Sequence, residues 1–281
     1  MVLFTYYLVM TSSIIRIKSI DEIPFHKYTS NDLIAYDLDD TVFVPIDKIM
    51  RTANAPQRTQ FINDIRSKAG NERVTYTYDS SKYMLVEDCI KEKINKDGLK
   101  SIAMTARRTG RPTADCTTPV EDKTLSILKE LGISFRSDLF CDVEFDGLSY
   151  TNPIHIDNLI DKTLKPFDLP SNAMIKDGVL FTNNIMKGLV IGKLFDHFKF
   201  YPDTFVLIDD SEKNHQSMTK EIDELNKRLG LNIKFEGYHY TGATDLLDNT
   251  LNPNIVQLQK ESLLKDDYQY LSDEMTKKLN L

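Results

Sequence analysis

The chain has 281 residues, of which 41% are hydrophobic and 27% charged, and this is typical of one globular domain or of one domain with an insertion. Its net charge of −7 gives no electrostatic reason to expect nucleic acid as a partner. The three cysteines, Cys89, Cys116 and Cys141, are too widely spaced for a zinc site or a disulfide framework, so we expect inert thiols.

The N-terminal segment contains an apolar run from Leu3 to Met10. This run is too short to span a bilayer. The first basic residue, Arg16, follows the run, whereas a secretory signal has its basic residues before the apolar part. We therefore expect an edge strand or a tucked tail in a soluble protein, with no evident membrane association.

Segments rich in β-branched and apolar residues alternate with segments of helical period, which predicts the α/β class, with a parallel sheet flanked by helices. The expected strands are Leu33 to Tyr36, Ser101 to Met104, Val179 to Phe181, Phe205 to Ile208 and Ile233 to Tyr240. Polar residues follow the carboxyl end of each of the first four expected strands.

The stretch between the first two strands, Val42 to Lys100, is far longer than a plain connection and predicts an insertion, bounded at 46–98. Within it we expect a helix from Pro56 to Lys68, an extended piece containing Tyr76, Tyr78 and Tyr83, and a helix from Val86 to Asn95.

Three further helices follow from capping signals. One has Thr118 as N-cap, Pro119 at the first helical position, Glu121 completing a capping box, and Gly132 after its last residue. The others run from about Gly188 to Phe198 and from Lys213 to Leu229, where Gly230 ends the helix.

Three acids follow the first strand, in the sequence Asp37-Leu-Asp39-Asp40-Thr41. Ligands of open α/β sheets bind at the carboxyl ends of strands, so the fold delivers Asp37 to that edge. Asp39 can face the same space, which pairs a nucleophilic carboxylate with one that transfers protons. A solvated acidic loop is the alternative, but the buried strand and Thr41 favour a catalytic site.

Polar residues follow the next two strands. The hydroxyl of Thr105 could bond a phosphoryl oxygen. Arg107 and Arg108 come next, and either could hold a phosphate by two parallel hydrogen bonds, with solvated surface arginines as the alternative. Lys187 begins the helix that follows the third strand, although lysines lie most often at the surface.

The fourth strand ends in Asp209 and Asp210, and adjacent carboxylates suit a hard cation with oxygen ligands. If this pair meets Asp37 and Asp39, two charges ~4 Å apart repel by roughly 4 kcal/mol at an effective dielectric constant near 20. Such a cluster predicts bound Mg²⁺, which would also let an acidic protein accept an anionic substrate.

Taken in order, Asp37-x-Asp39-x-Thr41, Thr105, Lys187-Gly188 and Asp209-Asp210 resemble the four motifs of the haloacid dehalogenase superfamily of phosphatases. The resemblance covers Leu33 to Asn214 and implies a single domain over 1–281, with a Rossmann-like core and a small helical cap insertion at 46–98. Thr105-Ala-Arg-Arg, Gly178-Val-Leu-Phe-Thr182 and Ile208-Asp-Asp-Ser-Glu-Lys-Asn214 are similar to a bacterial branch that includes secreted effector phosphotyrosine phosphatases of intracellular pathogens.

The resemblance implies a role for each residue. Asp37 attacks phosphorus and becomes an aspartyl phosphate, and Asp39 protonates the leaving oxygen and later activates water. Thr105 and Lys187 hold the phosphoryl group, with Arg107 as a further substrate-binding residue. The Mg²⁺ ligands are Asp37, the backbone carbonyl of Asp39, Asp209 and, directly or through water, Asp210. The acid at Asp39 favours a phosphatase, because the dehalogenase pattern lacks it.

We therefore expect a phosphomonoesterase, with phosphotyrosine in protein as the leading substrate and a small metabolite phosphate as the alternative. A short cap would leave the site open, and the three insertion tyrosines could line its entrance or pack in the cap. The resemblance leaves the bacterial cytoplasm and secretion into a host cell both open.

A third hypothesis is a non-catalytic binding protein on the same fold. The stretch Ile255 to Leu279 is amphipathic enough to meet a partner or a membrane, although such helices more often pack on their own domain.

Overall fold

The computed structural model describes residues 12–96, 98–110, 118–136, 138–149 and 172–278. The apolar run from Leu3 to Met10 and Cys116 lie outside the described residues. Within the described ranges, no helix combines the length and the apolar character needed to cross a membrane.

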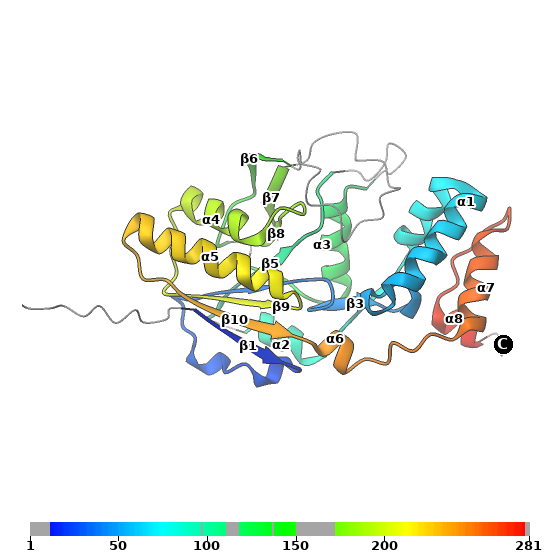
Figure 1. The fold of residues 1–281 in the computed structure, drawn as a ribbon, viewed down its shortest axis with the longest axis horizontal. Helices are drawn as coiled ribbons and strands as arrows, with labels where there is room; N and C mark the ends of the chain where they lie inside the picture. The colour runs from blue at the N-terminus through cyan, green and yellow to red at the C-terminus, as the bar shows by residue number, and fades with distance from the viewer. Residues whose placement is uncertain (1–11, 97, 111–117, 137, 150–171, 279–281) are drawn as a thin grey trace, which may run out of the picture.

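An eight-stranded sheet forms the centre of the molecule, in the order β1-β10-β9-β2-β5-β8-β7-β6 (Figure 1). The strands from β1 to β8 in that order run parallel, and β7 and β6 continue the sheet antiparallel. The five expected strands and the mixed α/β class are confirmed. The strands are β1 (Ser12–Ile17), β2 (Leu33–Tyr36), β5 (Lys100–Thr105), β6 (Val143–Ser149), β7 (Asn172–Lys176), β8 (Val179–Phe181), β9 (Thr204–Asp209) and β10 (Lys234–Tyr240).

The central strands are buried on both faces, which is why they read as continuous apolar runs. In β2, Ile34 and Tyr36 point into one core, and Leu33 and Ala35 into the other. On the second face pack α4 (Lys187–Phe198) and α5 (Glu212–Leu229), whereas α2 (Cys89–Ile94) and α3 (Val120–Glu130) contribute to the core of the first. The sheet is therefore held between two helical layers.

The helix boundaries differ from the sequence prediction mainly at α3. Pro119 is the cap residue instead of the first helical residue, and the Glu121 carboxylate accepts a hydrogen bond from the Gly110 backbone nitrogen (2.7 Å) instead of closing a capping box. The predicted C-terminal ends of α3 and α5 are confirmed. Gly132 and Gly230, which follow these helices, have φ angles of 70° and 66°, which glycine adopts readily.

A separate group of helices lies at one end of the sheet (Figure 1). We call it the helical lobe, consisting of residues 46–82 and 248–278. Its helices are α1 (Ala55–Ser80), α7 (Pro253–Leu263) and α8 (Asp273–Lys278), joined to the sheet on the C-terminal side through α6 (Gly242–Asp245). It has its own apolar core, formed by Ile49, Met50, Phe61, Ile62, Ile65, Val74 and Leu263.

Hydrogen bonds tie the two segments of the lobe together. The Asp47 carboxylate accepts from the Tyr270 hydroxyl (2.5 Å) and from the Asp273 backbone nitrogen (2.7 Å). Arg51 donates to the carbonyl oxygen of Asp248 (3.1 Å). Up to Lys278, the last residue described, the stretch that begins at Ile255 is thus two helices separated by a connection, and α7 packs on α1 of its own chain.

The insertion differs from its prediction in two ways. Tyr76 and Tyr78 lie in α1, which breaks at Gly70 (φ 80°) and then continues as helix, so the prediction of an extended piece is wrong for both. Packing of Val74 in the lobe core outweighs the strand preference of these residues. Tyr83 is extended, in β4 (Tyr83–Leu85), which pairs with β3 (Phe43–Pro45).

The second helix of the insertion belongs to the sheet and not to the lobe. α2 covers Cys89–Ile94, shorter than the predicted Val86 to Asn95, and its Ile90 and Ile94 are buried in the core of the first sheet face. The helical lobe therefore takes only the first part of the expected insertion at 46–98.

Candidate active site

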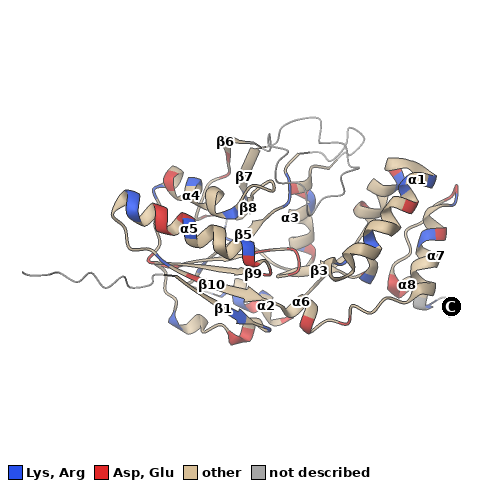
Figure 2. Cartoon of the chain, in the orientation of Figure 1, with Lys and Arg blue, Asp and Glu red and all other residues tan. Residues whose placement is uncertain are grey.

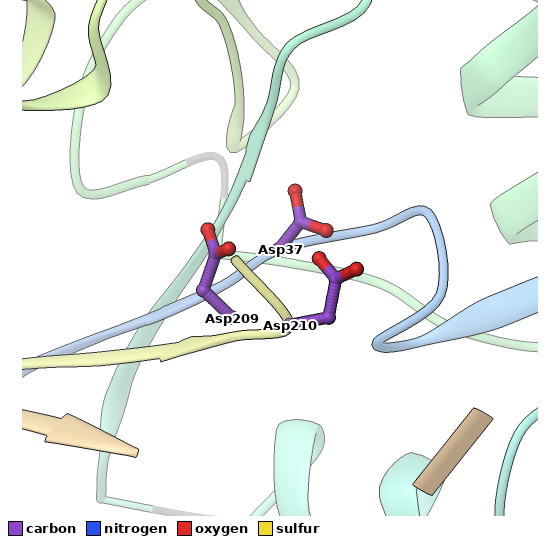
Figure 3. A group of neighbouring side chains, drawn as sticks. All are labelled: Asp37, Asp209 and Asp210. Carbon is purple, nitrogen blue, oxygen red and sulfur yellow. The ribbon is translucent and has the colours of Figure 1, made fainter. Parts of the chain in front are cut away.

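Three carboxylates meet at the carboxyl ends of the neighbouring strands β2 and β9 (Figure 3). Asp37 follows β2, Asp209 ends β9 and Asp210 comes next. One oxygen of each lies within 4.8 Å of the others. The parallel pairing of Tyr36 with Ile208 sets this meeting, and the Asp37 backbone nitrogen extends the ladder by donating to the Ile208 carbonyl oxygen (2.8 Å). We call these three side chains the acid cluster.

Lys187, the first residue of α4, lies inside the acid cluster. Its ammonium nitrogen is 2.5 Å from Asp37 Oδ1 and 2.6 Å from Asp209 Oδ2, and the residue is only 1% exposed. The alternative of a surface lysine is therefore wrong. Burial alone would lower the pKa of Lys187, but the two carboxylates outweigh it and hold that pKa above its usual value. The side chain stays charged at neutral pH.

Asp209 is held in one orientation by donors on several sides. Asn214 Nδ2 lies 2.9 Å and 3.0 Å from its two carboxylate oxygens, and the Ser211 backbone nitrogen donates to Oδ1 (2.8 Å). Asn214 lies in the first turn of α5, which places it above the end of β9. A buried carboxylate with this many donors is fixed in position before any ligand arrives.

Two histidines were not expected from the sequence. His215 Nε2 lies 3.1 Å from the backbone carbonyl oxygen of Asp209, and His239 Nε2 lies 2.9 Å from that of Asp210. Each ring holds the backbone of one acid. His239 comes from β10, and only the pairing of β10 with β9 reveals its place.

Asp39 lies outside the acid cluster and pairs with Arg107. Arg107 donates through Nε to Asp39 Oδ2 (2.8 Å) and through Nη2 to Oδ1 (2.7 Å). The guanidinium also donates to Thr124 (3.1 Å) and lies over the rings of Phe43 and Tyr83. Carboxylate and phosphate are both held by this two-pronged contact, so in the structure Asp39 takes the contact that the sequence assigned to a substrate phosphate.

Thr105 ends β5, which pairs with β2, and it is therefore at the same sheet edge as Asp37. The residue is fully buried. Its hydroxyl oxygen accepts a hydrogen bond from the Arg107 backbone nitrogen (3.1 Å). Thr105 thus shapes the turn that presents Arg107 to Asp39.

The acid cluster has more negative charge than its lysine can neutralise. Burial raises the pKa of Asp37 well above its usual value, Lys187 opposes this, and the charges of Asp209 and Asp210 add to it. Burial, followed by the charge of Asp209, raises the pKa of Asp210 to about 7. Two such charges 4.8 Å apart repel by roughly 3 kcal/mol at an effective dielectric constant near 20.

The donor set of the acid cluster fits a divalent cation. The available ligand atoms are carboxylate oxygens, which Mg²⁺ prefers, and no cysteine or histidine belongs to the group among the described residues. Asp37, Asp209 and Asp210 would hold the ion, which would offset their mutual repulsion.

The acid cluster predicts a pH-dependent gain in stability with Mg²⁺. The folded pKa of Asp210 lies above its unfolded value of 3.8, so in metal-free protein its contribution is fully present below pH 3.8 and is lost as pH rises through about 7. We expect Mg²⁺ to bind the deprotonated acids, so the rise in melting temperature on adding it should be larger near pH ~8 than near pH ~5. An equal rise at both values would contradict a role for these acids.

His215 changes stability in the opposite direction, because burial lowers its pKa and its contribution is lost as pH falls. Comparing melting temperatures with and without Mg²⁺ at each pH cancels this background.

A family model described as "Protein of unknown function (DUF2608)" matches residues 16–277. The chain belongs to the DUF2608 family. Comparison with curated proteins and with solved structures found no match.

In this DUF2608 protein, the residues expected from the sequence fall into two groups. Asp37, Lys187, Asp209 and Asp210 come together in one hydrogen-bonded and electrostatic cluster. Asp39 and Arg107 form a separate pair, which Thr105 supports through the Arg107 backbone. Acidic and basic residues are otherwise interspersed along the DUF2608 chain, as Figure 2 shows.

Proposed function

We propose that the protein is a Mg²⁺-dependent phosphomonoesterase of the haloacid dehalogenase type, with Asp37 as nucleophile. The observation that carries this proposal is the burial of Lys187 between Asp37 and Asp209 at the carboxyl ends of adjacent parallel strands. A scaffold has no need of three acids held together against their repulsion, whereas phosphoryl transfer requires a positioned nucleophile and charge stabilisation.

Each side chain has a place in this chemistry. Asp37 attacks phosphorus in line, the bond to the leaving oxygen breaks, and the aspartyl phosphate is later hydrolysed by water. Asp39, which Arg107 holds as a carboxylate, must leave that pair and take up a proton from solvent before it can give one to the leaving oxygen, and it then takes one from that water. Lys187 orients Asp37 and stabilises phosphoryl charge. Mg²⁺, when bound, neutralises the cluster and the phosphoryl oxygens.

The helical lobe and the β3–β4 pair occupy the place of a cap on a Rossmann-like core of this type. Tyr78 and Tyr83 line a cavity of about 210 Å³ that begins at Asp39. The leading substrate is phosphotyrosine in protein, which rests on the family resemblance. The modest size of the cavity favours the second candidate, a small metabolite phosphate.

The experiment that tests the proposal is hydrolysis of 4-nitrophenyl phosphate with Mg²⁺ and after chelation. We expect turnover that chelator abolishes and that Mg²⁺ restores, because the uncompensated cluster repels an anionic phosphate. Turnover that chelator leaves unchanged would overturn the metal requirement. Phosphotyrosine peptides compared with sugar phosphates and nucleotides then rank the two substrate classes.

A further inference from the structure

A cavity of about 210 Å³ lies between the helical lobe and the loop that carries Asp39. The loop side consists of Asp39, Asp40 and Pro45, and the remaining wall comes from the insertion: Met50, Thr52, Arg58, Tyr78, Ser81 and Tyr83. We call it the leaving-group pocket, because under the proposed function Asp39 protonates the oxygen that departs. On that function, we assign the ester group beyond that oxygen to this cavity, because Asp39 lines it.

The size and walls of the leaving-group pocket suit a compact group. A buried cavity of ~150 Å³ holds a benzene ring, so this cavity accepts one ring or a short chain with its substituents. Pro45, Met50 and Tyr83 give apolar surface. Tyr83 is fixed by an edge-to-face contact with Phe43, with ring centroids 5.1 Å apart.

Arg58 is the cation of the leaving-group pocket. Its Nη1 donates to the backbone carbonyl oxygen of Met50 (3.0 Å), which holds the side chain against the wall. In the described part of the chain, no carboxylate forms an ion pair with Arg58. Asp40 lines the same cavity, where burial raises its pKa and the charge of Arg58 partly opposes that rise. Asp39, the other acid that lines the pocket, has both oxygens engaged by Arg107. A half-buried guanidinium without a paired anion favours a ligand that brings one.

We propose that Arg58 is a specificity-determining residue that selects phosphate esters whose compact leaving group carries a second negative charge, such as a carboxylate. The proposal rests on the proposed function. The scissile phosphate lies at Asp37, the body of the leaving group fills the pocket, and its anionic substituent meets Arg58. The carboxylate belongs either to a small phosphoester or to an acidic residue beside a phosphorylated side chain.

The test compares two substrates that differ by one carboxylate group, phenyl phosphate and 4-carboxyphenyl phosphate. With Mg²⁺ present, we expect kcat/KM of the wild type to favour the carboxylated ester by about 10-fold or more, the scale of one hydrogen bond to a charged group. Arg58→Gln should remove this preference, and Arg58→Glu should reverse it. Lys68→Gln is the matched control, because Lys68 is exposed on the same helix and outside the pocket, and it should keep the preference.

The outcomes separate the two proposals. Hydrolysis of neither ester by a folded protein overturns the proposed function together with this inference. Hydrolysis of both with equal kcat/KM, or a preference that Arg58→Gln retains, overturns the role of Arg58 alone. Melting temperatures show whether each variant is folded, and Arg58→Lys, which keeps the charge, should keep part of the preference if another variant unfolds.

A second pair of substrates identifies the source of the carboxylate. Phosphotyrosine peptides with Glu or Gln next to the phosphorylated residue should show the same Arg58-dependent preference if the natural substrate is a protein. A preference confined to the small ester supports a metabolite.

Discussion

Asp37→Asn is expected to reduce hydrolysis of 4-nitrophenyl phosphate by ~10³-fold or more, the scale of removing a catalytic nucleophile. The amide keeps the shape of the side chain but cannot form the acyl phosphate. The burial that raises the pKa of Asp37 shows that its charge is costly in the folded protein, so the variant should be at least as stable as the wild type without Mg²⁺. Steady-state kinetics and thermal melting of the same preparation measure both effects.

Asp39→Asn is the companion variant, because it leaves the nucleophile in place and removes the proposed proton donor. The 4-nitrophenolate leaving group departs without protonation far more easily than an alkoxide does. The loss should therefore be small for 4-nitrophenyl phosphate and large for an alkyl phosphate. Full activity of Asp37→Asn, or equal losses of Asp39→Asn on both esters, would contradict the assigned roles.

Lys187→Met is expected to lower the free energy of unfolding by about 3–5 kcal/mol in the absence of Mg²⁺. This is the range measured when one partner of a buried ion pair is removed. The substitution fills the space of the side chain but leaves Asp37 and Asp209 without their shared cation. Denaturant titration with chelator measures the difference. Mg²⁺ should recover part of it, because it supplies positive charge to the same acids.

Lys193→Met is the matched control for this change, since Lys193 lies in the same helix, α4, with its side chain exposed. It should change the free energy of unfolding by less than about 0.5 kcal/mol. The burial of Lys187 described above would be wrong if both variants were equally stable in chelator.

The sheet and the acid cluster could be predicted because the relevant signals are local. Buried parallel strands read as apolar runs, and the polar residue after each run must lie at one sheet edge, whatever the order of the strands. Asp37, Asp209 and Asp210 follow from that rule alone. The rule does not supply the burial of Lys187, because a lysine at a helix start reads as solvated until the acids around it are placed.

The sequence could not predict the pairing of Asp39 with Arg107 or the composition of the helical lobe, for a different reason. The Asp39–Arg107 pair and the helical lobe each bring together segments that are distant in the sequence. The sequence of one segment does not indicate which other segment it will contact. Arg107 reads equally well as a phosphate ligand, since the same guanidinium contact serves both anions. Tyr270 and Asp47 show no pattern that would join them, yet their hydrogen bond helps to fix α7 and α8 on α1.

The two-part construction of the helical lobe has a consequence for how the chain folds during synthesis. α1 emerges from the ribosome long before α7, with strands β5 to β10 of the sheet made in between. Until α7 arrives, the lobe core that contains Phe61 and Ile65 lacks Leu263 and stays incomplete. Nascent chains stalled before Pro253 should therefore bind chaperones and be cut by protease within α1, whereas the finished sheet resists.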